Sequence, residues 1–280
     1  MIVKAGFIFC FLIFSTSCLA DKPAVMLPEK YQHDVDIQSY WISEKLDGVR
    51  ARWDGHHLIS RGGKILVAPD WFVKDFPVVT LDGELWLARG RYADTWSIVS
   101  QKKAHQAWQQ IKFMLFDIPE IKGTFSQRLQ ALQVLEKKNT SVYLQVIPQF
   151  RLPDKTALMK KLDEIVAQGG EGLILHHQSA RYKSGRSHDI LKLKPILFGQ
   201  ATVIGYRAGK GKFTGKVGSL KVQTAKGQIF YVGSGLSNAE RANPPPLSAT
   251  IKFKYQGHTK TGLPRFPIFL EVLNPNYRKP

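Results

Sequence analysis

Cysteine is almost absent from this 280-residue chain, and its position is as informative as its scarcity. The two cysteines, Cys10 and Cys18, both lie within the first twenty residues. The rest of the chain can therefore form neither a disulfide nor a cysteine-bound zinc site. The first twenty residues carry a single charge, Lys4, followed by the apolar run from Ala5 to Phe14 and then by small residues before the expected cleavage point. This pattern is typical of a secretory signal peptide.

A long hydrophobic run is also lacking, because the apolar stretch of the leader is too short to span a bilayer comfortably. We therefore expect residues 1–20 to be removed, with cleavage after Ala20, and we expect no stable membrane span. A mature chain without thiols suits the oxidising periplasm. Two alternatives stay open. One is lipoprotein anchoring at Cys18, which the absence of a branched aliphatic residue before it disfavours, and the other is a cytosolic protein with an unusual start.

Acidic residues are scarce towards the C-terminus. From Phe198 to the end there are thirteen Lys or Arg residues against two acids, Glu240 and Glu271, and the whole chain has a net charge of +18. Ordinary apolar content and six tryptophans indicate a globular protein and exclude a disordered basic tail. This charge asymmetry favours a polyanionic partner, and nucleic acid is preferred to anionic lipid because no amphipathic anchor follows the leader.

Strand and helix patterns alternate along the mature chain, which predicts an α+β fold without internal repeats. Residues 51–60 indicate two short strands around an Asp-Gly turn. Apolar spacing predicts helices over 126–138, with Ser126 as N-cap, and over 155–168. Strands are expected over 78–87 and 113–118. After Lys194-Pro195 short strands alternate with glycine turns, which suggests a domain over 21–195 and a small barrel over 196–280.

The most informative motif is Glu44-Lys45-Leu46-Asp47-Gly48-Val49-Arg50. It sets a lysine between carboxylates, beside a glycine and close to an arginine. A lysine nucleophile needs surroundings that disfavour its ammonium form, and neighbouring cations have that effect. The motif alone is equally compatible with an exposed turn in a basic protein, so companion motifs must decide.

Five further blocks follow in order, and their joint spacing is far more specific than any one of them. They are Ser60-Arg61-Gly62-Gly63-Lys64, Leu81-Asp82-Gly83-Glu84-Leu85-Trp86, Phe113-Met114-Leu115-Phe116-Asp117-Ile118-Pro119, Glu171-Gly172-Leu173-Ile174-Leu175 and Leu191-Lys192-Leu193-Lys194-Pro195. The pairs His56-His57 and His176-His177 invite a metal interpretation. Adjacent residues of a strand point to opposite faces, which argues against it.

With these blocks the chain resembles the covalent nucleotidyltransferases, and specifically the small ATP-dependent DNA ligases of bacteria, the exported E-type. The resemblance covers nearly all of the mature chain. It implies an adenylation domain of antiparallel sheets with flanking helices, followed by an OB-fold β-barrel. It also implies three steps at a nick in duplex DNA, namely lysine adenylation, AMP transfer to the 5′-phosphate and attack by the 3′-hydroxyl.

The resemblance also implies a role for each matching residue. Lys45 matches the nucleophile that carries AMP, with Glu44 beside it at the nucleotide, and Lys192 and Lys194 match the pair on the α-phosphate. Arg50 and Arg61 match contacts to the nucleotide or the nick phosphate, Glu84 the ribose contact, and Phe116 and Ile174 the two faces of the adenine site. Glu171 matches a metal-binding carboxylate, with Glu84 nearby. Carboxylate ligands without cysteine favour Mg²⁺ or Mn²⁺.

The expected barrel carries glycines and cations in alternation between Arg207 and Lys221. We expect Lys210, Lys212, Lys216, Lys221 and Arg265 to contact DNA phosphates, which gives sequence-independent, salt-sensitive binding. A flexible basic hairpin without that role is the alternative. One chain suffices to join a nick, so we expect a monomer, and no protein partner is inferred.

The match weakens at the C-terminus, where Glu271 and Leu273 stand at positions at which cations are expected. Arg265, Arg278 or Lys279 could substitute for them in the first step with ATP. Only about 24 mature residues precede Lys45, too few for a nicotinamide-recognising domain, so ATP is preferred to NAD. Two other functions stay open: an RNA ligase or related nucleotidyltransferase, and a basic DNA-binding protein without activity.

Overall fold

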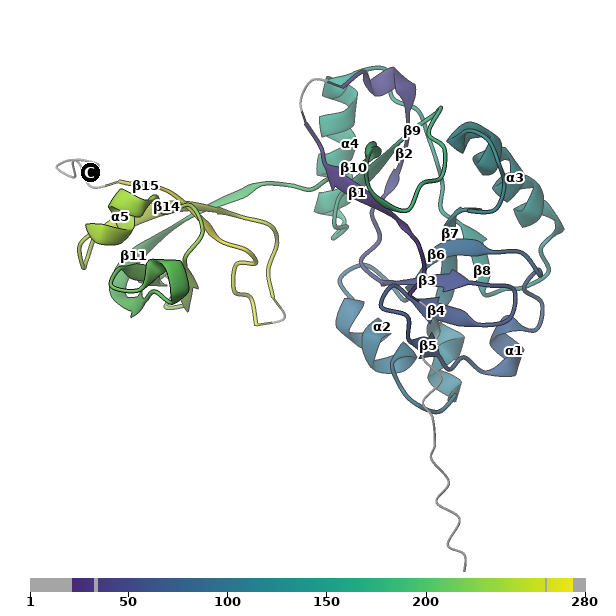
Figure 1. Ribbon diagram of the computed structural model, residues 1–280, viewed down its shortest axis with the longest axis horizontal. Coiled ribbons are helices and arrows are strands. Elements are labelled where there is room, and N and C mark those ends of the chain that lie inside the picture. The colour runs from purple at the N-terminus through teal and green to yellow at the C-terminus, as the bar shows by residue number, and fades with distance from the viewer. Residues whose placement is uncertain (1–21, 33–34, 260, 274–280) are drawn as a thin grey trace, which may run out of the picture.

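The computed structural model describes residues 22–32, 35–259 and 261–273 as two units joined by an extended strand (Figure 1). The leader with Cys10 and Cys18, and the C-terminal Arg278 and Lys279, lie outside the described residues. In the described part, no helix has the length and apolar character that crossing a membrane requires.

The larger unit is built on two sheets. The first has six strands in the order β5-β4-β3-β6-β7-β8, and the second has four in the order β1-β10-β9-β2. The strands of the first are β3 (Val49–Trp53), β4 (Leu58–Ser60), β5 (Ile65–Leu66), β6 (Leu81–Trp86), β7 (Lys112–Asp117) and β8 (Leu144–Val146). Those of the second are β1 (Met26–Lys30), β2 (Tyr40–Glu44), β9 (Leu173–His177) and β10 (Gly185–Leu193).

The expected antiparallel pairing holds for most neighbours in these sheets. Among the described strands of this unit, β1 pairs with β10 in parallel and β7 with β8 in parallel, and the other pairs are antiparallel. A parallel pair needs a long connection between its strands. The β1–β10 pair therefore brings the start of the unit against its end.

The hairpin expected over residues 51–60 is confirmed by the pairing of β3 with β4. In β3, buried Val49, Ala51 and Trp53 alternate with half-buried Arg50 and Arg52, which is the period of a strand with one face in the core. The turn places Gly55 at φ +98°, a conformation that favours glycine.

Helices cover the outer faces of both sheets: α1 (Asp70–Val73), α2 (Tyr92–Val99), α3 (Phe125–Lys138) and α4 (Lys155–Ala167), with short 3₁₀ turns η1 (Ile37–Ser39) and η2 (Gln106–Gln110). The expectation of Ser126 as the N-cap of α3 is wrong. Thr124 caps the helix in a capping box with Gln127, which satisfies two backbone donors. Ser126 lies inside the first turn, and its hydroxyl accepts a hydrogen bond from Trp41 Nε1 at 2.9 Å.

Three apolar clusters hold the larger unit together. The largest surrounds Trp108, Phe113 and Leu132 on the six-stranded sheet. A second packs Leu158 and Leu162 of α4 against the four-stranded sheet. The third lies under α3, where Phe125 and Leu129 join residues of the same sheet. This α3 cluster covers part of the sheet face opposite α4, and the rest of that face forms a pocket wall.

The smaller unit is a five-stranded antiparallel sheet in the order β13-β12-β11-β14-β15. Its elements are β11 (Leu197–Ala208), η3 (Gly211–Phe213), β12 (Val217–Gln223), β13 (Ile229–Val232), α5 (Asn238–Ala242), β14 (Thr250–Tyr255) and β15 (Ile268–Val272). A parallel bridge between Ser234 and Ile268 joins the two edges, with Phe269 N donating to Ser234 O at 2.8 Å. The sheet therefore closes into a barrel, which leaves no free edge there.

Candidate active site

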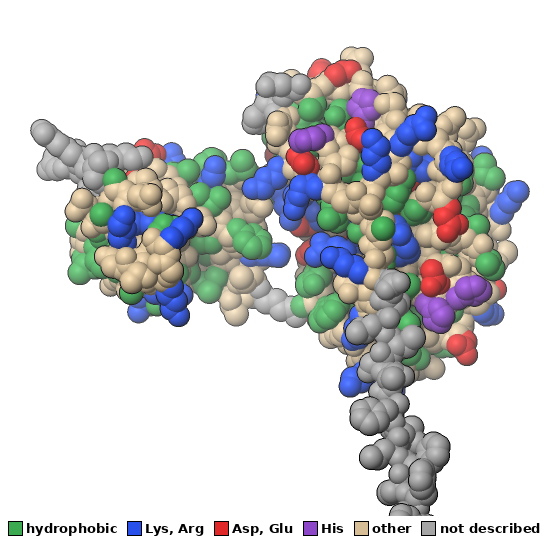
Figure 2. All heavy atoms as spheres, viewed as in Figure 1, with side chains coloured by type: hydrophobic (Ala, Val, Ile, Leu, Met, Phe, Trp, Pro, Cys, Tyr) green, Lys and Arg blue, Asp and Glu red, His purple; other side chains and the backbone are tan. Residues whose placement is uncertain are grey.

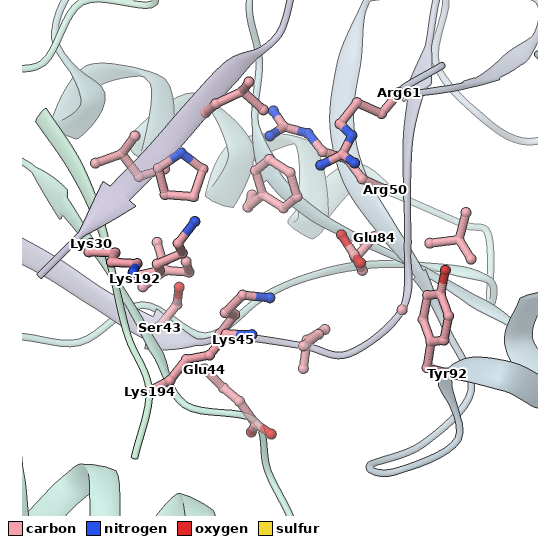
Figure 3. Close-up of a pocket in the computed structure, with 18 of the residues that line it drawn as sticks. Lys30, Ser43, Glu44, Lys45, Arg50, Arg61, Glu84, Tyr92, Lys192 and Lys194 are labelled. Carbon is pink, nitrogen blue, oxygen red and sulfur yellow. The ribbon is translucent and has the colours of Figure 1, made fainter. Parts of the chain in front are cut away.

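A large pocket opens between the two sheets of the larger unit and extends to the smaller unit. Its cavity volume is about 1170 Å³, enough for a nucleotide. The predicted residues that line it are Glu44, Lys45, Arg50, Arg61, Glu84, Phe116, Ile174, Lys192 and Lys194. Lys254, Tyr255, Gln256 and Phe266 line it from the smaller unit. In Figure 3 Lys45, Lys192 and Lys194 lie across the pocket from Arg50, Arg61 and Glu84.

Lys45 follows β2 directly and is held by both its backbone and its side chain. Its backbone N–H donates to Gly172 O at 2.9 Å. Gly172 has φ +148°, and a Cβ there would lie 2.2 Å from Leu193 O, so this junction requires glycine. The Lys45 ammonium donates to Glu171 Oε2, and the Lys194 ammonium donates to Glu171 Oε1. Glu171 thus bridges two lysines that directly follow different strands, β2 and β10.

These charges change the ionisation of their neighbours. Burial alone would raise the pKa of Glu171, but Lys45 and Lys194 together hold it below its usual value, so the carboxylate is ionised. Burial lowers the pKa of Lys192, and nearby cations lower it further. Two of these cations, Lys30 and Arg186, were not identified in the sequence. Lys30 lies opposite Lys192 in the parallel β1–β10 pair.

Strand register orders the pocket face of the four-stranded sheet into rows. One row contains Ser43, Ile174 and Lys192 on three adjacent strands. The next row inwards contains Trp41, His176 and Ile190. Lys45 and Lys194 follow the row of Ser43 at the outer side. Cations therefore lie at one end of the face and apolar contacts at the other.

Phe116 reaches the same pocket from β7 of the facing sheet, so Phe116 and Ile174 line it from opposite walls. The Arg50 guanidinium lies 5.1 Å from the Phe116 ring centroid. Arg50 also donates to Met26 O at 2.7 Å and to the fully buried Asp82 at 3.1 Å. Arg61, in contrast, is exposed in the turn after β4. Arg50 is thus tied into the protein, whereas Arg61 is available to a ligand.

Glu84 lies on β6 and is half-buried in the pocket. Burial raises its pKa to about 7, although Lys45 and Arg50 act in the opposite sense. Gly48 makes this approach possible, because a Cβ there would lie 2.4 Å from Leu85 O and 2.8 Å from Glu84 Cγ. Asp47 is a further carboxyl in this region, and burial followed by the charge of Glu171 raises its pKa.

Glu44, the residue before the lysine, makes an ion pair that the sequence did not reveal. Both of its oxygens accept from Arg89, each at 2.8 Å, in a bidentate arrangement. Arg89 also donates to Gln168 at 2.8 Å. The pair fixes the end of β2 immediately before Lys45, and a bidentate guanidinium is well suited to that task.

The carboxylates present suit a divalent ion that keeps much of its water. Among the described residues, no group of three or more His, Cys, Asp or Glu side chains could enclose a metal. Glu84 and Glu171 interact electrostatically next to Lys45. Mg²⁺ is commonly held by one or two carboxylates together with substrate phosphates rather than by a closed cage. The donor set therefore fits such an ion.

The paired histidines give no metal site among the described residues. His176 is buried and stacks on Phe125 with ring centroids 3.5 Å apart, whereas His177 packs edge-on against Tyr40. The two rings lie on opposite faces of β9, as expected. Burial lowers the pKa of His176, so this side chain is neutral.

Four predicted DNA-binding lysines of the smaller unit lie apart from the pocket. Lys210, Lys212 and Lys216 lie on the loop around η3, and Lys221 lies on β12. Within the described part of the chain, none of these four lines the pocket. Arg241 anchors the loop from below, donating to Val217 O, Gly218 O and Gly233 O. Figure 2 shows Lys and Arg side chains on this unit and along the hollow between the units.

Near the end of the chain, Arg265 is exposed next to Phe266, which lines the pocket. Arg265 is close enough to Asp47 to counteract the rise of its pKa. Glu271 lies on β15 and pairs with Lys252 at 3.3 Å. In the described part of the protein, Glu271 and Leu273 do not line the pocket.

Comparison with known proteins gives the same picture over most of the chain. The sequence pattern described as ATP dependent DNA ligase domain matches residues 26–194, and that described as DNA ligase OB-like domain matches residues 208–272. A DNA ligase of Haemophilus influenzae is 36% identical over 258 residues, which is 92% of this chain and 95% of that protein.

Solved structures agree with these sequence relatives. A structure described as a structure-function analysis of Lig E DNA ligases superposes with a TM-score of 0.81 and 43% identity, over 89% of this chain and 98% of that one. The ATP complex of the bacteriophage T7 ligase has a TM-score of 0.53 and 17% identity, over 89% of this chain and 98% of that one. The second likeness concerns the fold alone.

Proposed function

The chain belongs to the ATP-dependent DNA ligase family, and we propose that Lys45 is the nucleophile that takes AMP from ATP before the nick is sealed. The observation that carries this proposal is the position of Lys45. Its ammonium lies in the pocket, bonded to Glu171 and close to Lys192 and Lys194. Family and fold agree with the expected adenylation domain and OB-like barrel.

In the first step, Lys45 Nζ attacks the α-phosphorus of ATP. A nitrogen–phosphorus bond forms, the bond to the pyrophosphate oxygen breaks, and pyrophosphate leaves. The Lys45 amine must first lose a proton, and the Glu171 carboxylate is the acceptor in contact with it. Lys192 and Lys194 stabilise the negative charge on the phosphoryl oxygens.

A divalent ion, which we propose to be Mg²⁺ or Mn²⁺, would be held by Glu171 and Glu84, and it supplies charge neutralisation for the phosphates. Glu171 can both accept the proton of Lys45 and hold the divalent ion only if its contact with Lys45 opens when substrate is bound. Glu84 also lies where a ribose hydroxyl could be bound. The adenine ring would stack between Phe116 and Ile174, which line the pocket from opposite walls.

The later steps need nicked duplex DNA next to the same pocket. AMP moves from Lys45 to the 5′-phosphate, and the 3′-hydroxyl then attacks that phosphate and displaces AMP. We propose that Arg61 and the cations Lys210, Lys212, Lys216, Lys221 and Arg265 hold the DNA backbone. Contacts of this kind are independent of base sequence.

Mass spectrometry of the protein after incubation with ATP and Mg²⁺ tests the nucleophile. An AMP adduct is expected on the wild type and none on Lys45→Ala. The matched control is Lys160→Ala, an exposed lysine of α4, which should carry the adduct on Lys45 as the wild type does. An adduct that persisted on Lys45→Ala would refute the assignment.

Substrate competition separates the alternative functions. Labelled ATP or GTP, followed by nicked DNA or nicked RNA, should give joined product with ATP and DNA alone. Joining of RNA, or labelling by GTP, would instead indicate another nucleotidyltransferase of the superfamily. Binding of nicked DNA with no adduct from ATP would indicate a DNA-binding protein without activity.

We also propose export to the periplasm, with a mature chain of residues 21–280 that acts as a monomer and divides into domains at 195/196. The leader pattern supports export, and the end of β10 at Leu193 and start of β11 at Leu197 support the division. N-terminal sequencing of the periplasmic fraction should give Asp21. An intact Met1 in the cytosol, or a lipid on Cys18, would contradict export to the periplasm as a chain that begins at Asp21.

A further inference from the structure

One side chain of the pocket presents a buried acceptor without a partner. Gln149 lies in the segment that follows β8, where Phe150 and Ile42 exchange two backbone hydrogen bonds of 2.9 Å. This antiparallel bridge brings Gln149 alongside Ser43 of β2. Gln149 lines the pocket, and among the described residues its Oε1 has no hydrogen-bond partner and no exposed surface.

A second unpartnered atom lies in the same wall. His176 is 5% exposed, it lines the pocket, and its Nε2 has no partner among the described residues. Leaving a buried polar group without a hydrogen bond is unfavourable, because the group loses its bonds to water and gains none in the protein. Two such atoms in one wall are therefore explained best by a ligand that supplies their partners.

The position of Gln149 shows which part of the ligand it meets. Ser43, its neighbour, lies in one row with Ile174 and Lys192. Lys192 is at the phosphate end of this row, and Gln149 is beyond Ser43 at the other side of Ile174. A ring stacked on Ile174 would therefore turn one edge towards Gln149, away from the phosphate lysines.

An amide oxygen accepts hydrogen bonds and cannot donate them. Adenine carries an amino donor at position 6, whereas guanine carries a carbonyl oxygen there and, with the Gln149 amide oxygen facing the base, would bring two acceptors together. We propose that Gln149 is a specificity-determining residue, which selects ATP by accepting a hydrogen bond from the 6-amino group of the base. This inference rests on the proposed position of the base between Phe116 and Ile174.

The test uses ATP and purine riboside triphosphate, which lacks the 6-amino group, and measures formation of the Lys45 adduct. For the wild type, we expect a KM for ATP about tenfold below that for the analogue, since one buried hydrogen bond is lost. Gln149→Met should bring the two KM values together with little change in kcat. Gln149→Glu, whose carboxylate accepts only, should keep the preference for ATP.

Gln145→Met provides the control, because Gln145 is exposed on the neighbouring β8. It should behave as the wild type with both nucleotides. The ratio of KM values is measured within each variant, so a change in stability alone does not alter it. An unchanged ratio in Gln149→Met, or loss of the preference in Gln149→Glu, would overturn the role of Gln149. Failure of the wild type to form any Lys45 adduct would instead overturn the proposed function.

Discussion

Glu171 bonds to Lys45 through one carboxylate oxygen while the other oxygen binds Lys194. This arrangement keeps the Lys45 ammonium in place within the pocket, and it occupies the carboxylate that a metal ion would need. The contact thus describes a resting state. In the proposed mechanism, substrate and metal would replace this contact before Lys45 reacts.

Removal of this carboxylate should impair chemistry and spare DNA binding. For Glu171→Gln we expect adduct formation to slow by at least about 100-fold, because the proposed proton acceptor and metal ligand would be lost. Affinity for nicked DNA should stay within about twofold. Glu164→Gln removes an exposed carboxylate paired with Lys161 and should change neither quantity. An equal loss of adduct formation and of DNA affinity in Glu171→Gln would point to a folding role instead.

Glu84 should make stability fall as the pH rises. Its folded pKa is about 7 against an ordinary value of 4.5, so the folded state binds the proton more tightly and is favoured below pH 4.5. That contribution is lost as the pH rises from 4.5 through 7. We therefore expect the Tm of the wild type to fall relative to Glu84→Gln across this interval. Parallel Tm curves would contradict the raised pKa.

The two arginines of the motifs should respond differently to removal. Arg50→Ala leaves the fully buried Asp82 with fewer partners and should cost about 2 kcal/mol of unfolding free energy in chemical denaturation. Arg61→Ala, at an exposed turn, should leave stability unchanged and weaken joining of nicked DNA. A stable Arg50→Ala protein would show that Asp82 is satisfied by Arg52 and Tyr182 alone.

The basic loop should contribute to affinity through charge. Reversal of Lys210 and Lys212 to Glu should weaken binding of nicked DNA at moderate salt, and it should reduce the slope of log K against log salt by about 2. Lys137 and Lys138, exposed at the end of α3, provide a reversal of equal net charge. The loop has no role in DNA binding if both double variants bind equally, as fluorescence anisotropy would reveal.

Several features were predictable because they depend on neighbours in sequence. The β3–β4 hairpin follows from alternating residues around an Asp-Gly turn, and the helix over 155–168 from its apolar spacing. The cap of α3 was missed by two residues, because Ser126 and Thr124 are both good caps and only Thr124 is followed at the third residue by Gln127. Local chemistry offered two choices, and the capping box decided between them.

The sequence by itself determined the family, the order of its motifs and the excess of positive charge, because these are properties of the chain. Tertiary structure decided which groups meet. The parallel pairing of β1 with β10 places Lys30 opposite Lys192, and a single bridge brings Gln149 to the pocket. The tertiary structure also bonds Arg50 to Asp82 and leaves Arg61 exposed. Such contacts join residues far apart in sequence, so they depend on strand register and burial, which no local pattern specifies.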